Sequence, residues 1–192
     1  MNKGNINLSR EQVIQAAVIP QIIMLTISII WIYISPKDNV LNYLKLNYLV
    51  LLYGVLTGAI LAFIGYAVYK TAKRFNKLST TIELFEKLLA PMFVNIKAVD
   101  IFSLSIVSAF CEEVLFRGLI QLKFGILISS IAFGMLHLPG LKYWIYAVWA
   151  ALSGALFSYL FIFSGSLWLP ITAHAVNNVI GMFLLKTIKE KQ

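Results

Sequence analysis

Long apolar runs alternate along the chain with short polar or basic segments. The apolar runs cover 13–34, 46–69, 98–122, 125–138, 143–163 and 167–186. Most of them reach the roughly 20 residues that a helix needs to cross about 30 Å of hydrocarbon, whereas 125–138 is short for a span. The pattern therefore predicts an all-α integral membrane protein, a polytopic helical bundle of about six spans.

The segment 70–97 has a different pattern, because lysine and arginine residues alternate there with apolar ones. Glu83 and Glu86 lie inside it and count against a full span. Apolar positions at helical spacing can still form one face of a helix, namely Ile82, Leu84, Phe85, Leu88 and Leu89. We therefore expect an interfacial amphipathic helix that ends near Pro91.

Composition supports lipid as the solvent for most of the chain. Hydrophobic residues make up 60% of the sequence and charged residues 12%, and the mean hydropathy is +0.84. The net charge of +8 comes from basic residues between the apolar runs, not from a basic stripe with interleaved aromatics. That distribution is typical of membrane topology signals and argues against nucleic acid as a partner. It also favours a cytoplasmic location for both termini.

The ionisable and amide side chains inside the later apolar runs are few and concentrated. Such groups are costly in a membrane unless they are paired or hydrated, so each is a functional candidate. They are Glu112, Glu113, Arg117, His137, His174, Asn177 and Asn178. We accordingly divide the chain into an N-terminal two-span region with the basic interfacial helix, residues 1–97, and a four-helix core, residues 98–192, that carries these groups.

Helical spacing brings several of these groups together. Glu113 and Arg117 are four residues apart and can pair on one helix face, and His174 and Asn178 share the same spacing. Counting from the predicted turns, Glu112, His137 and His174 lie roughly 12 to 18 Å below one membrane face. We therefore expect three helices to deliver polar groups to one buried site.

The spacings form three ordered motifs: EExxxR from Glu112 to Arg117, FxxxH from Phe133 to His137, and HxxxN from His174 to Asn178. In this order, on successive helices, they resemble the CAAX protease and bacteriocin-processing family, also called CPBP or Abi. The type II CAAX prenyl endopeptidases belong to that family. Each motif alone is weak, but the ordered set is specific. The resemblance covers about residues 100–181.

The resemblance implies a membrane-embedded glutamate peptidase. Glu112 and His137 would activate water, and His174 and Asn178 would hold the oxyanion. A carboxylate can take a proton from water and pass it to the leaving amine, and imidazole N–H and amide donors suit a developing oxyanion. Supporting roles would belong to Glu113, Arg117, Phe133 and Asn177. Of these, Glu113 and Arg117 would fix the position of Glu112.

The resemblance also implies the surroundings of the protein. We expect a multi-pass protein of a bacterial cell membrane, with the lipid bilayer and a peptide or lipidated-protein substrate as its partners. The charge count would open the site to the extracytoplasmic face, whereas prenyl endopeptidases work from the cytoplasm.

Four alternatives to this interpretation remain open. A divalent metal such as zinc could be held by Glu112, His137 and His174, although no HExxH pair is present and we expect no cofactor. The same family also suits a non-catalytic immunity or scaffolding protein. A proton- or ion-coupled carrier is a third class, but we detect no inverted repeat. Finally, His174 and Asn178 could serve only as hydrogen-bond partners between helices.

Overall fold

The computed structural model describes residues 8–35 and 40–190, and every regular element within them is a helix. The elements are α1 (Arg10–Ile34), η1 (Val40–Tyr43), α2 (Tyr48–Arg74), α3 (Ser79–Glu83), η2 (Leu84–Leu89), α4 (Ala90–Phe93), α5 (Ala98–Leu115), η3 (Phe116–Gln121), α6 (Leu122–Leu136), η4 (Leu141–Tyr143), α7 (Trp144–Ser164) and α8 (Trp168–Glu190). The predicted all-α bundle is confirmed, and its helix boundaries lie close to the ends of the apolar runs.

Five helices within the described residues are long and apolar enough to cross a membrane, judged by length and composition. One of them, Ala98–Leu136, has 39 residues, which is about twice the length of a span. It breaks at Gly125, where φ is 82° and ψ is 174°. Beyond the break, the Ser129 Oγ donates to the Phe116 carbonyl at 2.8 Å. The chain therefore folds back at Gly125, so this helix forms both of the runs predicted at 98–122 and 125–138.

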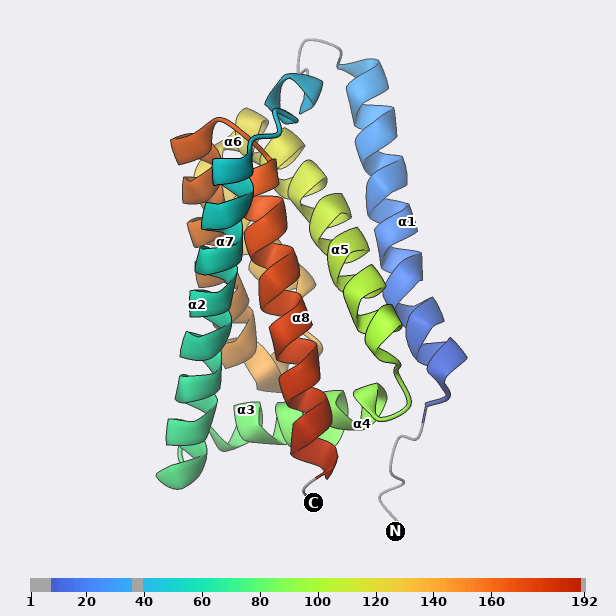
Figure 1. Ribbon diagram of the computed structural model, residues 1–192, viewed down its shortest axis with the longest axis vertical. Coiled ribbons are helices and arrows are strands. Elements are labelled where there is room, and N and C mark those ends of the chain that lie inside the picture. The colour runs from blue at the N-terminus through green and yellow to red at the C-terminus, as the bar shows by residue number, and fades with distance from the viewer. Residues whose placement is uncertain (1–7, 36–39, 191–192) are drawn as a thin grey trace.

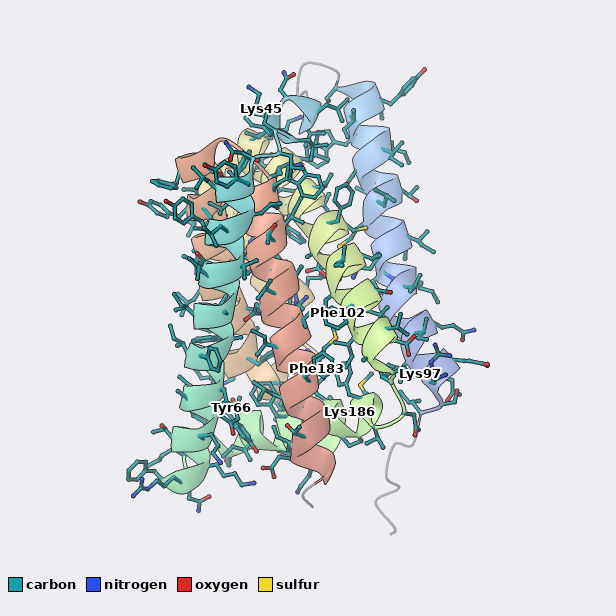
Figure 2. All side chains as sticks on the ribbon, in the orientation of Figure 1. Lys45, Tyr66, Lys97, Phe102, Phe183 and Lys186 are labelled. Carbon is teal, nitrogen blue, oxygen red and sulfur yellow. The ribbon has the colours of Figure 1, made fainter. Side chains whose placement is uncertain are left out.

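The helices have two distinct ends (Figure 1). The beginning of α1 and the last turn of α8 lie at one end, where α3, η2 and α4 run across the bundle; we call this the α4 end. Figure 2 shows Lys97 and Lys186 at the α4 end and Lys45 at the opposite end. Lys97 and Lys186 therefore lie at the end of the bundle where α1 begins and α8 ends. A multi-pass membrane protein is the architecture that these helices form.

The segment 79–93 is amphipathic, as predicted. Leu84 is completely buried, and Phe85 packs edge-to-face against Tyr146 of α7. On the polar side, Lys142 donates to the Glu83 carboxylate at 2.6 Å. The helical conformation continues to Phe93, slightly beyond the expected end near Pro91.

The N-terminal helices pack directly on the helices that carry the motifs. α1 contacts α5, and α2 contacts α8. Gly54 and Gly58 lie at the second contact, where an added Cβ would meet Thr172 or Val176 at less than 3 Å. Small residues at these points allow the two backbones to approach closely.

Candidate active site

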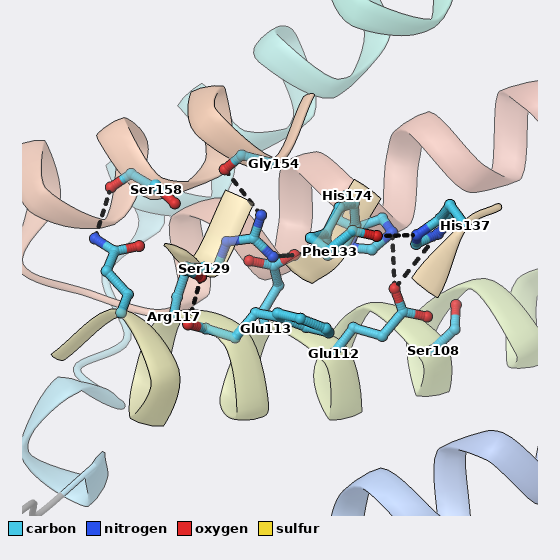
Figure 3. A network of polar contacts seen from close by, with 12 residues as sticks. Ser108, Glu112, Glu113, Arg117, Ser129, Phe133, His137, Gly154, Ser158 and His174 are labelled. Atoms are coloured by element: carbon cyan, nitrogen blue, oxygen red, sulfur yellow. Dashed lines mark hydrogen bonds and ion pairs between the residues drawn. The ribbon is translucent and has the colours of Figure 1, made fainter. Parts of the chain in front are cut away.

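Three helices deliver the predicted polar side chains to one place (Figure 3). Glu112 and Glu113 come from α5, His137 follows the last residue of α6, and His174 comes from the first half of α8. Glu112 is 6% exposed and His174 3% exposed, whereas a quarter of the His137 side chain is accessible. The expected common depth of the three motifs is therefore seen.

Both imidazole rings face the same carboxylate oxygen. Glu112 Oε2 lies 3.8 Å from His137 Nε2 and 3.9 Å from His174 Nε2. Both separations exceed a direct hydrogen bond. Within the described residues, this oxygen has no hydrogen-bond partner. The two nitrogens and the oxygen thus lie close together without direct hydrogen bonds between them, so all three are available to a reacting molecule.

The backbone fixes the proton on His137. Its Nδ1 lies 2.8 Å from the carbonyl oxygen of Phe133, one turn earlier on α6. A carbonyl oxygen can only accept, so Nδ1 carries the hydrogen and a neutral His137 presents its Nε2 lone pair to Glu112. The FxxxH spacing of four residues is the spacing at which a side chain reaches back to a helical carbonyl.

His174 is held by a buried ion pair. Its Nδ1 lies 2.8 Å from Glu113 Oε1, which also accepts from Arg117 Nη1 at 3.0 Å. Arg117 also donates through Nη2 to the Gly154 carbonyl at 2.9 Å. Glu113 and Arg117 are completely buried. The predicted Glu113–Arg117 pairing is confirmed, but its contact runs to His174 and not to Glu112, contrary to the expectation that the pair fixes the first glutamate.

Aromatic rings close the site on the side of Arg117. The Phe157 ring stacks on the His174 ring with centroids 5.0 Å apart, and the Arg117 guanidinium lies 4.5 Å from the Phe133 centroid. Phe133 is 2% exposed and Phe157 1%. These rings replace solvent around the cation and strengthen its pairing with Glu113.

The two asparagines line the same cavity one turn beyond His174. Asn178 Nδ2 donates to the Ser108 hydroxyl at 3.3 Å, and Asn177 Nδ2 lies 3.4 Å from Asn178 Oδ1. Asn178 is therefore near the site, with its amide turned toward α5. Asn177 contacts its neighbour and not the histidines.

Sequence reasoning missed three residues. Gln21 of α1 donates through Nε2 to Glu112 Oε1 at 3.2 Å and is 9% exposed. Ser108 and Tyr146 line the cavity next to Glu112. A lone amide in an otherwise apolar run is a signal that could have singled out Gln21. Nothing in the local pattern distinguishes Ser108 or Tyr146.

No group of three or more His, Cys, Asp or Glu side chains among the described residues is arranged to hold a metal ion. The one free cysteine in that part of the chain, Cys111, is buried.

A cavity of ≈ 680 Å³ joins the site to the α4 end of the bundle. Glu112, His137 and His174 line it together with residues of α3, η2 and α4, among them Ile82 and Phe93. The direction expected from the charge count, toward the opposite face, is therefore wrong. Counting residues from the turns gives the depth of a group in the bundle. The direction of access depends instead on where side chains leave space. Space is left on the side of the α4 end because α6 ends at the site.

Comparison with known proteins supports the resemblance. Residues 94–180 match the family model described as type II CAAX prenyl endopeptidase Rce1-like. The uncharacterized protein YpbD of Bacillus subtilis (strain 168) is 31% identical over 77 residues, which are 40% of this chain and 41% of that protein. The aligned part thus spans about two fifths of this relative's length. No solved structure gives a significant match.

The matched segment contains all three motifs and the helices α5, α6 and α7 in full. It therefore coincides with the part of the bundle that builds the site and implies the fold of a CAAX-type intramembrane protease. Residues 94–180 are therefore similar to the Rce1-like type II CAAX prenyl endopeptidases, as the three motifs indicated.

Proposed function

We propose that the protein is an intramembrane endopeptidase in which Glu112 and His137 activate water. The observation that carries the proposal is the convergence of two imidazole Nε2 atoms on Glu112 Oε2, each just beyond hydrogen-bond distance. A water molecule that bonds to both Glu112 and His137 would bridge separations of this size. His137 supplies an acceptor at Nε2 because its Nδ1 hydrogen is committed to the Phe133 carbonyl.

In the reaction, the water oxygen attacks the peptide carbonyl carbon while its proton moves to the Glu112 carboxylate, assisted by His137. The new C–O bond converts the carbonyl oxygen into an oxyanion. The C–N bond then breaks, and the proton passes from Glu112 to the leaving amine. A positioned acid–base group contributes typically about 10²- to 10⁴-fold to such a rate.

His174 and Asn178 would stabilise the oxyanion. The Nδ1 hydrogen of His174 bonds to Glu113, so its Nε2 can donate only when the ring carries protons on both nitrogens. Two nearby carboxylates, Glu112 and Glu113, would balance that positive charge. Asn178 would have to exchange its bond to Ser108 for one to the substrate.

The cavity supports a proposal for the substrate class. Its walls are mainly apolar side chains from the middle and the α4 end of the bundle, and its ionisable carboxylate and imidazole groups are those of the site. Such a cavity suits a peptide that carries a hydrophobic segment or a lipid beside the bond to be cut. With cytoplasmic termini, substrate would enter from the cytoplasmic side.

Cleavage by detergent-purified protein tests the proposal. Lipidated and leader peptides would be incubated with the wild type, Glu112→Gln, His137→Ala and the exposed control Glu11→Gln, with and without chelator. We expect cleavage by the wild type and the control only. Loss on chelation with recovery on added zinc would replace the metal-free mechanism by a metal-dependent one. Equal product from the wild type and Glu112→Gln would overturn the proposal and favour a non-catalytic scaffold.

A further inference from the structure

The first helix runs parallel to α5 and is joined to it at two polar points. At the α4 end, Arg10 donates to both carboxylate oxygens of Asp100, at 2.7 and 2.6 Å. The Asp100 carboxylate also accepts from the Lys97 backbone N–H at 2.9 Å. This bidentate pair fixes the height of α1 along α5, because a one-turn slide would break both bonds.

The second polar contact lies farther along both helices. Gln21 is eleven residues after Arg10, and Glu112 is twelve after Asp100, so both lie roughly 16 to 18 Å beyond the first contact. With α1 set at that height, the Gln21 amide meets the Glu112 carboxylate. Burial of the pair makes the bond matter more than it would in water.

We propose that Gln21 is a positioning residue for Glu112. The inference rests on the proposed peptidase function and adds a residue outside the matched segment 94–180. Gln21 holds Oε1, and this leaves Oε2 as the oxygen that faces His137 and His174. Among the described residues, no other side chain makes a hydrogen bond to Glu112.

An uncharged donor suits this position. An acidic side chain would repel Glu112 where it must accept a proton. A basic one would form an ion pair and weaken Glu112 as a proton acceptor. The amide orients the carboxylate without altering its charge. Other titratable groups interact with Glu112 from neighbouring elements: His137 after α6, Tyr146 on α7, His174 on α8 and Arg117 on η3.

The test compares two buried glutamines. Gln121 is 6% exposed, donates through Nε2 to the Ser158 carbonyl at 3.3 Å, and, like Gln21, has an unpaired Oε1. Gln21→Met and Gln121→Met therefore each remove one hydrogen bond donated by a buried amide. The first bond lies at the site, and the second lies away from it. We expect Gln21→Met to lower kcat about tenfold with KM within about twofold, and Gln121→Met to leave both near the wild type.

A second variant separates positioning from packing. In Gln21→Glu, the introduced carboxyl group can donate to Glu112 only when it is protonated, and it repels Glu112 when ionised. Its kcat relative to the wild type should therefore rise as the pH is lowered. A packing defect would give a ratio that does not change with pH. This pH comparison distinguishes positioning from packing even if Gln21→Met proves unstable.

The outcomes distinguish the two proposals. Wild-type kcat in Gln21→Met, or a constant ratio in Gln21→Glu, with an inactive Glu112→Gln, would overturn the role of Gln21 and leave the peptidase intact. Equal product from the wild type and Glu112→Gln would overturn both. A tenfold loss in Gln21→Met together with a pH-dependent ratio in Gln21→Glu would establish the positioning role.

Discussion

Gly58 of α2 lies directly against α8 at Ala173, the residue before His174. A Cβ added there would meet Val176 Cβ at 2.9 Å and the Ala173 carbonyl oxygen more closely still. Carbon atoms normally approach to about 3.5–4 Å. The substitution Gly58→Ala therefore requires α2 and α8 to separate by roughly 1 Å. Backbone atoms form part of the obstacle, so a side-chain rotation cannot relieve it.

That displacement would act on His174. Its Nδ1 lies 2.8 Å from Glu113, and its Nε2 lies 3.9 Å from Glu112. A misplacement of about 1 Å can cost on the order of 10²-fold in rate, and overpacking costs about 1–3 kcal/mol in stability. We expect Gly58→Ala to lower kcat/KM by about 10- to 100-fold and to lower the Tm measurably.

Gly65→Ala is the matched control on the same helix, because the nearest atom to an added Cβ is in Trp149 at 3.6 Å, an ordinary contact. It should leave kcat/KM unchanged and stabilise the helix by about 0.5–1 kcal/mol. Both variants would be purified in one detergent, and cleavage and thermal unfolding measured on the same samples. If Gly58→Ala matched Gly65→Ala in both assays, the close α2–α8 approach and its link to His174 would be refuted.

Three further variants test the ion pairs and the cysteine. Arg117→Met leaves Glu113 buried without its cation, so we expect a loss of about 3–5 kcal/mol of stability, seen as a much lower Tm; a small change would contradict the pairing. Cys111→Ala should retain full cleavage, since Cys111 is a buried free cysteine with no hydrogen bond to a site residue, and any loss above about threefold would assign it a further role. Lys142→Ala removes a partly exposed bridge to Glu83 and should change stability by less than about 1 kcal/mol in thermal unfolding, with a larger shift pointing to a rigid clamp.

Much of the fold follows from the sequence because lipid imposes simple rules. Apolar runs long enough to span determine the helices, and the turn near Gly125 was expected from the break between two runs. The Glu113–Arg117 pair was predictable because both residues lie on one helix, four positions apart. Local periodicity contains this kind of information.

Contacts between distant segments were not predictable in the same way. Gln21 meets Glu112 across 91 residues, and Glu113 meets His174 across 61. Both depend on the relative height of packed helices, which periodicity does not specify. The direction of the cavity was predicted wrongly for a related reason. Charge distribution indicates which end of the bundle lies in the cytoplasm, but it says nothing about which half of the interior is filled.

The shortness of α6 has a consequence for the bilayer itself. From Gly125 to Leu136 the helix rises only about 16 Å, roughly half of the hydrocarbon thickness, and residues 137–140 lie outside any helix before η4 begins at Leu141. The last turn of α6 satisfies several of its carbonyls locally, since Phe133 accepts from the His137 ring, and Gly134 and Met135 accept from the His137 and Leu138 N–H groups. The half-length helix thus ends in the cavity wall without a chain of exposed carbonyls. In the peptidase proposed above, the space left beyond its end would be the route by which water reaches Glu112 from the α4 end.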